Sequence, residues 1–87
     1  MEFEIEKGVT YTGDTFEEWG IIVNSGDKGI LKENNVEDRC IVSFPTLQLG
    51  WRSLKVGREK LLANGLSYSE TWDYMFPNHK DTGRYNL

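Results

Sequence analysis

Residues 39–56 read RCIVSFPTLQLGWRSLKV, and they decide which kind of fold this chain can adopt. The first six, 39–44, are dense in β-branched and aromatic side chains, which is the composition of a strand. We expect this strand to stop at Pro45, because proline cannot donate a hydrogen bond to a ladder. Gly50 leads into a further predicted strand, which Gly57 ends. The stretch predicts a mainly β chain.

The residues before this stretch predict two more strands. Apolar and polar side chains alternate over residues 3–11, so Phe3, Ile5, Val9 and Tyr11 are expected to face the core, while Glu2, Glu4 and Glu6 face solvent. Residues 13–26 are interpreted as a long ordered loop with Trp19 near its tip. Another strand is expected to begin at Gly29, where two backbones approach closely. Residues 33–38 are expected to form a polar loop.

The remainder of the chain favours a helix. Residues 58–63 fit either a short helix or one helical turn followed by a short strand. Ser67 and Glu70 have the spacing of a capping box. The apolar side chains Tyr68, Trp72, Met75 and Phe76 follow at helical spacing, and Pro77 ends the run. We therefore expect a helix over about 68–76 and a polar tail from residue 78 to residue 87.

Size and composition favour one small cytoplasmic domain. The chain has 87 residues, of which 38% are hydrophobic and 28% are charged. Its start lacks the basic residues and the long apolar run of a secretory signal, and no stretch is long enough to span a membrane. Cys40 is the single cysteine, so we expect a buried, reduced thiol.

Residues 7–63 resemble a small five-stranded barrel of the Src-homology-3-like or KOW type. The pieces that carry the resemblance are Lys7-Gly8-Val9, Gly26-Asp27-Lys28-Gly29-Ile30, Cys40-Ile41-Val42-Ser43-Phe44, Trp51-Arg52-Ser53-Leu54-Lys55-Val56 and Gly57-Arg58-Glu59-Lys60-Leu61. The last of these would form a short helical turn before the final strand. The expected fold is mainly β (α+β), with a barrel over 1–63 and a helix packed on it within 64–87, all in one domain.

The resemblance does not transfer a ligand. Peptide-binding Src-homology-3 domains use a run of alternating aromatic residues, which residues 9–14 lack. KOW-type domains tend to be basic where they touch RNA, whereas the first half of this chain is acidic. The function must therefore be inferred from charge and aromatic residues.

Charge is unevenly distributed along the chain. Residues 1–38 carry ten acidic and three basic side chains, a net charge of −7, and residues 39–87 carry seven basic and four acidic ones, a net charge of +3. Folding can interleave these charges or segregate them. If they segregate, the loop with Asp14, Glu17, Glu18 and Trp19 is the predicted protein-binding site, and it would suit a partner with a basic surface.

The alternative is a nucleic-acid-binding module that uses the basic segment. Its candidate residues are Trp51, Arg52, Lys55, Arg58 and Lys60. Residues 58–76 also fit a helix-turn-helix, although the second helix would carry Glu70 and Asp73 and no basic residue, which argues against DNA binding.

No motif in the chain predicts catalysis. Residues 26–29 lack the spacing of a phosphate-binding loop, and one histidine with one cysteine does not make a zinc site. We expect no enzyme activity, no cofactor and no metal. The sequence predicts a non-catalytic protein-binding accessory or regulatory module, such as an adaptor or an inhibitor, including one that a phage carries against a host factor.

Overall fold

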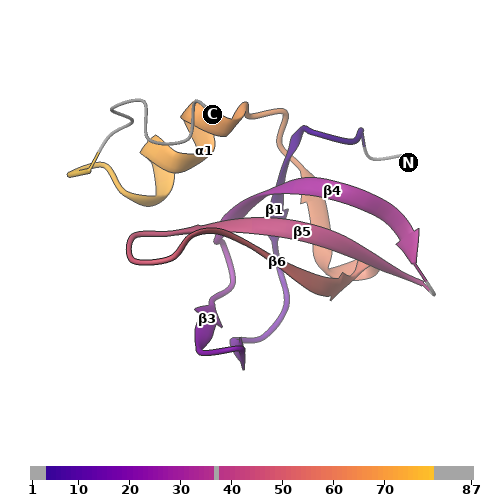
Figure 1. The fold of residues 1–87 in the computed structure, drawn as a ribbon. Coiled ribbons are helices and arrows are strands. Elements are labelled where there is room, and N and C mark those ends of the chain that lie inside the picture. The colour runs from indigo at the N-terminus through magenta and orange to yellow at the C-terminus, as the bar shows by residue number, and fades with distance from the viewer. Residues whose placement is uncertain (1–3, 37, 80–87) are drawn as a thin grey trace.

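The computed structural model describes residues 4–36 and 38–79, which form an antiparallel β structure with one helix (Figure 1). The main sheet has five strands in the order β6-β5-β4-β1-β7. Its strands are β1 (Gly8–Tyr11), β4 (Lys28–Val36), β5 (Arg39–Thr46), β6 (Gly50–Gly57) and β7 (Leu61–Ala63). The other elements are the hairpin of β2 (Phe16–Glu18) and β3 (Ile21–Val23), a 3-10 turn over Arg58–Lys60, and the helix α1 (Tyr68–Met75).

The predicted mainly β class with one C-terminal helix is confirmed. The strands expected around residues 39–44 and 51–56 form, and the 3-10 turn precedes the last strand of the main sheet. The barrel is not closed, however, because the edge strands β6 and β7 do not pair within the described residues. Strand β7 has three residues, so it offers few main-chain groups for a second ladder. The five strands remain an open, curved sheet.

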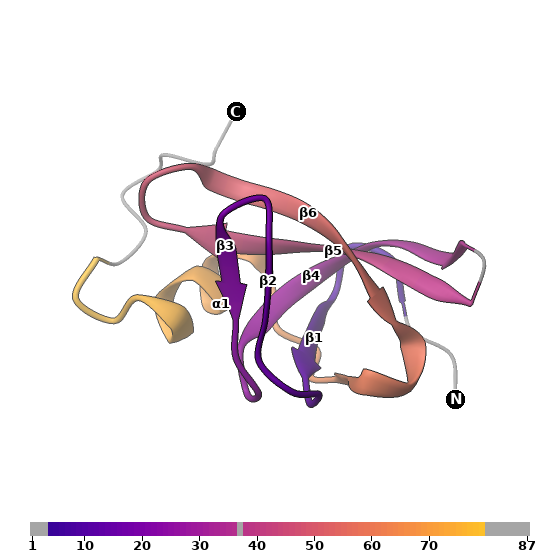
Figure 2. The ribbon, with the colours of Figure 1, turned by 90° about the horizontal axis from the view of Figure 1, so that it is seen from below.

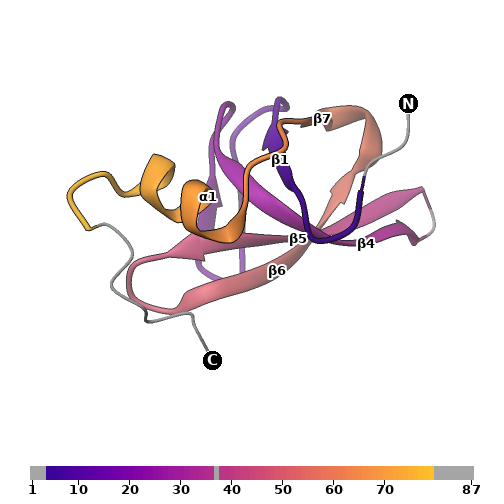
Figure 3. The ribbon, with the colours of Figure 1, turned by 90° about the horizontal axis from the view of Figure 1, so that it is seen from above.

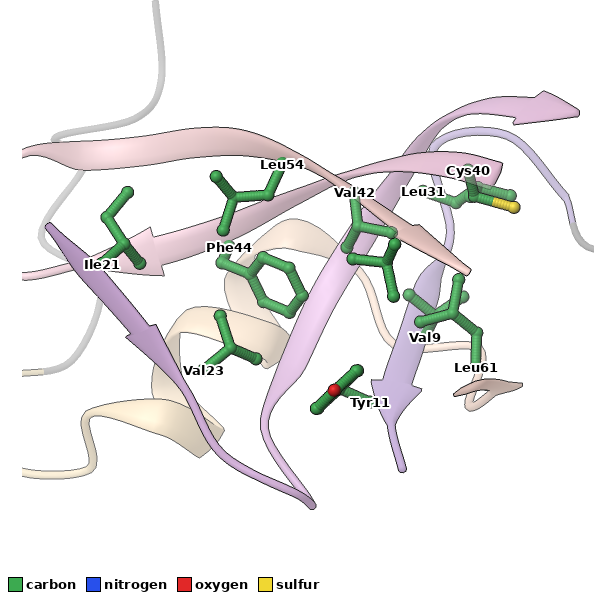
Figure 4. Close-up of a cluster of buried hydrophobic side chains, with 11 residues drawn as sticks. Val9, Tyr11, Ile21, Val23, Leu31, Cys40, Val42, Phe44, Leu54 and Leu61 are labelled. Atoms are coloured by element: carbon green, nitrogen blue, oxygen red, sulfur yellow. The ribbon is translucent and has the colours of Figure 1, made fainter. Parts of the chain in front are cut away.

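The core lies between this sheet and the β2–β3 hairpin. Leu31, Val42 and Leu54 are aligned across β4, β5 and β6, and all three are buried. Ile21 and Val23 of the hairpin are also buried and close the other side (Figure 4). The full cluster consists of Val9, Tyr11, Ile21, Val23, Leu31, Cys40, Val42, Phe44, Leu54, Val56 and Leu61. The buried free thiol of Cys40 agrees with the prediction.

Gly29 is a point of close backbone approach, as predicted. A Cβ atom at this position would lie 2.6 Å from the Cγ1 atom of Val42 and 2.9 Å from the carbonyl oxygen of Ser43. These contacts are shorter than van der Waals packing allows. Only glycine therefore permits β4 to lie this close to β5.

The helix α1 covers the outer face of the sheet, opposite the hairpin (Figures 1 and 3). Both bonds of the predicted capping box form: the Glu70 amide donates to the Ser67 hydroxyl at 3.2 Å, and the Ser67 amide donates to the Glu70 carboxylate at 2.9 Å. Trp72 is only 1% exposed. Its ring centroid lies 5.9 Å from that of Trp51 on β6 and 5.1 Å from that of Phe76. The predicted apolar stripe is thus the face that joins α1 to the sheet.

The first predicted strand is shorter than expected. Residues 5–7 form a turn and a bend, and β1 begins only at Gly8. Glu6 has a φ of +69°, which is incompatible with a continuous strand, and Ile5 is 47% exposed. The expected burial of Ile5 is therefore wrong. Phe3 and Glu2 lie outside the described residues.

Three other expectations about local structure are corrected. Residues 33–36 continue β4 and pair as far as Val36 opposite Arg39, so the expected polar loop is mostly strand. Strand β5 runs through Pro45 to Thr46, because its pairing with β4 ends at Ser43 and Pro45 faces only β6. The segment expected to be a long loop contains a regular hairpin.

The helix-turn-helix alternative is wrong. Residues 58–60 form the 3-10 turn, and residues 61–63 form β7, which pairs with β1. Of the two alternatives for this segment, the turn with a short strand is observed. The expected polar tail lies outside the described residues from residue 80 onward.

Candidate functional site

The tip of the β2–β3 hairpin has an unusual turn. Glu18 pairs with Ile21, which leaves Trp19 and Gly20 as the two turn residues. Both have positive φ angles, +57° and +76°, as a type I′ turn requires. Asn or Asp followed by Gly is the preferred pair for this turn, whereas a bulky side chain is uncommon in the left-handed region. Trp19 therefore occupies a position that disfavours it.

Trp19 is also the most exposed large hydrophobic side chain among the described residues, with 82% of its surface accessible. The core cluster does not include it. The fold thus holds a tryptophan in a strained turn without burying it. Strained positions that add nothing to the core are characteristic of functional sites.

The base of the hairpin is held by specific hydrogen bonds. The Tyr11 hydroxyl donates to the carbonyl oxygen of Asp14 at 2.5 Å, and the Gly26 amide donates to the carbonyl oxygen of Tyr11 at 2.7 Å. The Tyr11 amide donates to the carbonyl oxygen of Asp27 at 2.8 Å, and the Tyr11 ring packs edge-on against Phe16 at 5.3 Å. These contacts order the base of the β2–β3 hairpin (Figure 2), and the register of the hairpin places Trp19 at its tip.

The four residues of the predicted acidic site do not form one cluster. Asp14 lies at the base of the hairpin and Trp19 lies at its tip. Glu17 and Glu18 are both exposed, but neighbouring residues of a strand point to opposite faces. Glu17 shares the outer face with Ile22, which is directly opposite it, while Glu18 lines a hollow on the side of β6.

The residues of the predicted basic site also lie apart from one another, in different hollows of the surface. Arg52 lines a groove of about 360 Å³ together with Trp19 and Leu49. Lys55 and Lys60 line the hollow that also contains Asp14 and Glu18. The acidic and basic halves of the sequence are therefore interleaved here.

The other two members of the basic set lie further inside the fold. Trp51 packs edge-on against Tyr68 of α1 at 5.1 Å, and Arg58 is half-buried in the 3-10 turn. The sequence made Trp51 a candidate residue of the alternative nucleic-acid-binding site, and in the structure it contributes to the interface between the sheet and α1.

Sequence reasoning missed the apolar surface beside Trp19. Ile22, Leu47 and Leu49 are 59%, 41% and 51% exposed, and they come from β3 and from the turn between β5 and β6. Leu47 and Leu49 flank Gln48 between the two predicted strands, and this pair was the only available signal. Only the fold brings them opposite β3.

A groove of about 450 Å³ runs between these elements. It is bounded by residues 20–24 of β3 and its flanks, by residues 44–49 at the end of β5 and in the following turn, and by Met75 and Phe76 of α1. Asp27 is the one charged residue among the described residues that line it. The groove is therefore mainly apolar, with a single acidic group.

A polar cluster elsewhere joins the start of the chain to α1. The Lys32 ammonium lies 2.7 Å from the Glu6 carboxylate and also donates to the Tyr68 hydroxyl, which in turn donates to Glu6 at 2.7 Å. The hydrogen bond from Lys32, with that from Tyr68, lowers the pKa of Glu6. The bond to Glu6 raises the pKa of Lys32, and burial raises the pKa of Tyr68. This cluster ties β4 to the helix.

The potential metal ligands among the described residues are dispersed. Within residues 4–36 and 38–79, no group of three or more histidine, cysteine, aspartate or glutamate side chains is arranged to hold a metal ion. Cys40 is fully buried, with its thiol 3.5 Å from the side-chain oxygen of Asn34, and His79 is exposed after α1. No helix in this part of the chain is long and apolar enough to cross a membrane.

Comparison of the chain with protein families, with curated proteins and with solved structures finds no match. The function is therefore inferred from the hairpin tip, the apolar groove and the charges around them.

Proposed function

We propose that this chain is a non-catalytic protein-binding module, of the adaptor or inhibitor kind, whose contact surface is the tip of the β2–β3 hairpin. The observation that carries the proposal is Trp19, which is 82% exposed with a φ of +57°. Its strained backbone and exposed ring are both unfavourable in the free protein. Burial of the ring against a partner supplies a reason for its presence.

The surroundings of Trp19 support a protein partner. Tryptophan is enriched among residues that dominate binding energies, and such residues are surrounded by contacts that exclude water. Leu49, which is 51% exposed, and Arg52 line the same groove as Trp19. Arginine is also enriched in interfaces. This combination resembles the centre of an interface more than an ordinary exposed surface.

The charge of the hairpin indicates which partner it prefers. Residues 13–27 contain four acidic side chains and no basic one, and two of the four, Glu17 and Asp27, lie outside the hollow that Asp14 and Glu18 share with Lys55 and Lys60. A partner with a basic surface would be steered to this end of the molecule, and association would weaken as salt rises.

A second function has one observation in its favour. Trp19 and Arg52 line one groove, and an exposed aromatic ring beside an arginine can stack on a nucleobase and neutralise a phosphate. Binding through about three phosphates would make log affinity fall with log salt at a slope of roughly −2 to −3. The absence of detectable binding to mixed RNA and DNA at low salt would remove this candidate.

The proposal is tested by quantitative affinity capture from a lysate of the source cell. The full chain is compared with Trp19→Asn, which suits a type I′ turn, and with Leu62→Ala as a matched control. Leu62 is 61% exposed on β7, at an edge of the main sheet. A partner retained by the full chain and the control, but lost with Trp19→Asn, would support the proposal. Partners retained equally by all three would contradict it.

A further inference from the structure

Strand β3 has a free edge. Within the described residues it pairs only with β2, in an antiparallel register that places Glu17 opposite Ile22. Glu18 and Ile21, the pair beside the two-residue turn, exchange main-chain hydrogen bonds. Hydrogen-bonded and non-hydrogen-bonded pairs alternate along an antiparallel ladder, so the next pair, Glu17 and Ile22, does not exchange them. The amide and carbonyl groups of Ile22 therefore point away from β2, toward open space.

The groove lies along this free edge. Ile22 lines it, and so do Phe44, Met75 and Phe76 on the other side. Its volume of about 450 Å³ is within the range of peptide- and ligand-sized sites. An extended segment laid in the groove would meet main-chain groups on one side and apolar side chains on the other.

We infer that the free edge of β3 binds an extended, basic segment of a protein partner by strand addition, with Ile22 providing the main-chain donor and acceptor. The inference rests on the proposed function and specifies how the partner is held. In this binding mode, main-chain hydrogen bonds contribute affinity, while pockets for alternate side chains contribute specificity.

Charge and side-chain alternation define the occupant. Successive side chains of an added strand would point alternately toward the apolar groove and toward the outer face of the hairpin. Glu17 lies on that outer face beside Ile22, and Asp27 lines the groove. The segment should therefore carry apolar residues at alternate positions and lysine or arginine between them.

The same charges argue against a second copy of this chain. Pairing two β3 edges would place two hairpins side by side, each with Glu17 on the face that it shares with Ile22, away from the hollow that holds Lys55 and Lys60. Like charges in close proximity disfavour association. A basic partner removes this repulsion, whereas self-association increases it.

The test uses the full chain and synthetic six-residue peptides in which lysine alternates with valine. Nuclear magnetic resonance titration should show shifts in the amides of residues 20–24, and hydrogen exchange of the Ile22 amide should slow in the complex. Two further peptides carry N-methyl groups on all valine or on all lysine residues. Because alternate amides of an added strand face β3, one methylated peptide should lose about three- to tenfold in affinity and the other should retain it.

A matched pair of chain variants tests the same hydrogen bonds from the protein side. Ile22→Pro removes the amide donor, whereas Ile22→Thr retains it, and both variants lose the apolar isoleucine side chain that lines the groove. Ile22→Pro should therefore weaken binding of the lysine-valine peptide more than Ile22→Thr does. If Ile22→Pro does not fold, the methylated peptides decide the matter. The inference would be overturned if both methylated peptides bound with equal affinity, or if a glutamate-valine peptide bound as tightly as the lysine-valine peptide. The absence of shifts at residues 20–24 would also overturn it. Concentration-dependent dimerisation that is lost in Ile22→Pro would also overturn it.

Failure of the inference can be distinguished from failure of the proposed function. A cellular partner lost with Trp19→Asn but retained by a folded Ile22→Pro would overturn strand addition and leave the protein-binding function intact. A cellular partner whose binding is unaffected by either variant would overturn both strand addition and the proposed contact at the hairpin tip.

Discussion

The indole of Trp72 lies 5.9 Å from the indole of Trp51, and this contact joins α1 to β6 across the outer face of the sheet. Trp72 also donates from its ring nitrogen to the carbonyl oxygen of His79 at 2.6 Å. Replacing Trp72 with alanine should lower the free energy of unfolding by ~3–5 kcal/mol, the range for emptying a large aromatic site. Urea denaturation measures the loss. A chain ending at residue 64 that is as stable as the full protein would contradict the role assigned to α1.

The strained turn predicts an opposite effect at Trp19. Asn-Gly is the preferred pair for a type I′ turn, and the indole contributes little burial, so Trp19→Asn should raise the free energy of unfolding by about 0.5–1 kcal/mol. The same variant should cost 2 kcal/mol or more of partner binding, about the threshold for a hot-spot residue, through faster dissociation. Denaturation and binding kinetics measure the two effects. Lower stability with unchanged binding would show that Trp19 serves the fold.

Glu17 and Glu18 point to opposite faces of the hairpin, so their effects should separate. Glu17→Lys should slow association with a basic partner on the order of tenfold at low salt, because exposed interface charges act mainly on encounter. Glu18→Lys should have a smaller effect, since Glu18 lines a hollow that already contains Lys55 and Lys60. Biosensor kinetics at several salt concentrations distinguish the two. Equal association rates for both variants would show that the face of the hairpin that carries Glu17 and Ile22 is not the contact surface.

The cluster of Glu6, Lys32 and Tyr68 predicts a dependence of stability on pH. The pKa of Glu6 is lowered in the folded protein, so its contribution is present above its ordinary pKa and is lost as pH falls through the lower folded value. The pKa values of Lys32 and Tyr68 are raised in the folded protein, so the stability that these two groups contribute is lost only in alkaline solution. Half of the Glu6 side chain is exposed, which makes the effect small and sensitive to salt.

The comparison of the full chain with Glu6→Gln isolates this effect. The difference between their free energies of unfolding should be constant from about pH 6 to pH 8 and should shrink as pH falls below the ordinary glutamate pKa of 4.5. Chemical denaturation at each pH gives the curve. A difference that grows in acid would contradict the assignment.

The close approach at Gly29 predicts a cost for any side chain there. Gly29→Ala would place a Cβ atom 2.6 Å from Val42 and 2.9 Å from the Ser43 carbonyl oxygen, so the strands must separate. Overpacking of this kind costs about 1–3 kcal/mol. Thermal or urea denaturation measures it, with Ser25→Ala at an exposed turn as the control. Unchanged stability of Gly29→Ala would show that β4 and β5 can move apart without loss.

Local patterns were enough to predict the main elements. The β-branched run at 39–44, the capping box at 67–70 and the apolar stripe ending at Phe76 each depend on neighbours in the chain, and each forms as expected. The close approach at Gly29 and the position of Trp19 near a tip were also predicted. These features follow from periodicity, helix capping and glycine, whose effects extend over a few residues.

Features that depend on distant neighbours were predicted wrongly or missed. Pro45 lies within a strand because β4 stops pairing before it, and Ile5 is exposed because the chain turns at Glu6. Whether the basic and acidic segments form separate surfaces was left open by the sequence, and the fold places Lys60 and Asp14 in one hollow. Strand pairing decides these outcomes, and its partners lie far away in the sequence.

The sequence by itself determined the β-rich class, the C-terminal helix and the presence of a tryptophan among acidic residues. Tertiary structure alone decided that Glu17 and Glu18 face opposite ways and that Leu47 and Leu49 lie across a groove from Ile22. The physical reason is one of range. Propensity and capping act between residues a few positions apart, whereas a binding surface consists of side chains that only the packing of the hairpin against the sheet brings together.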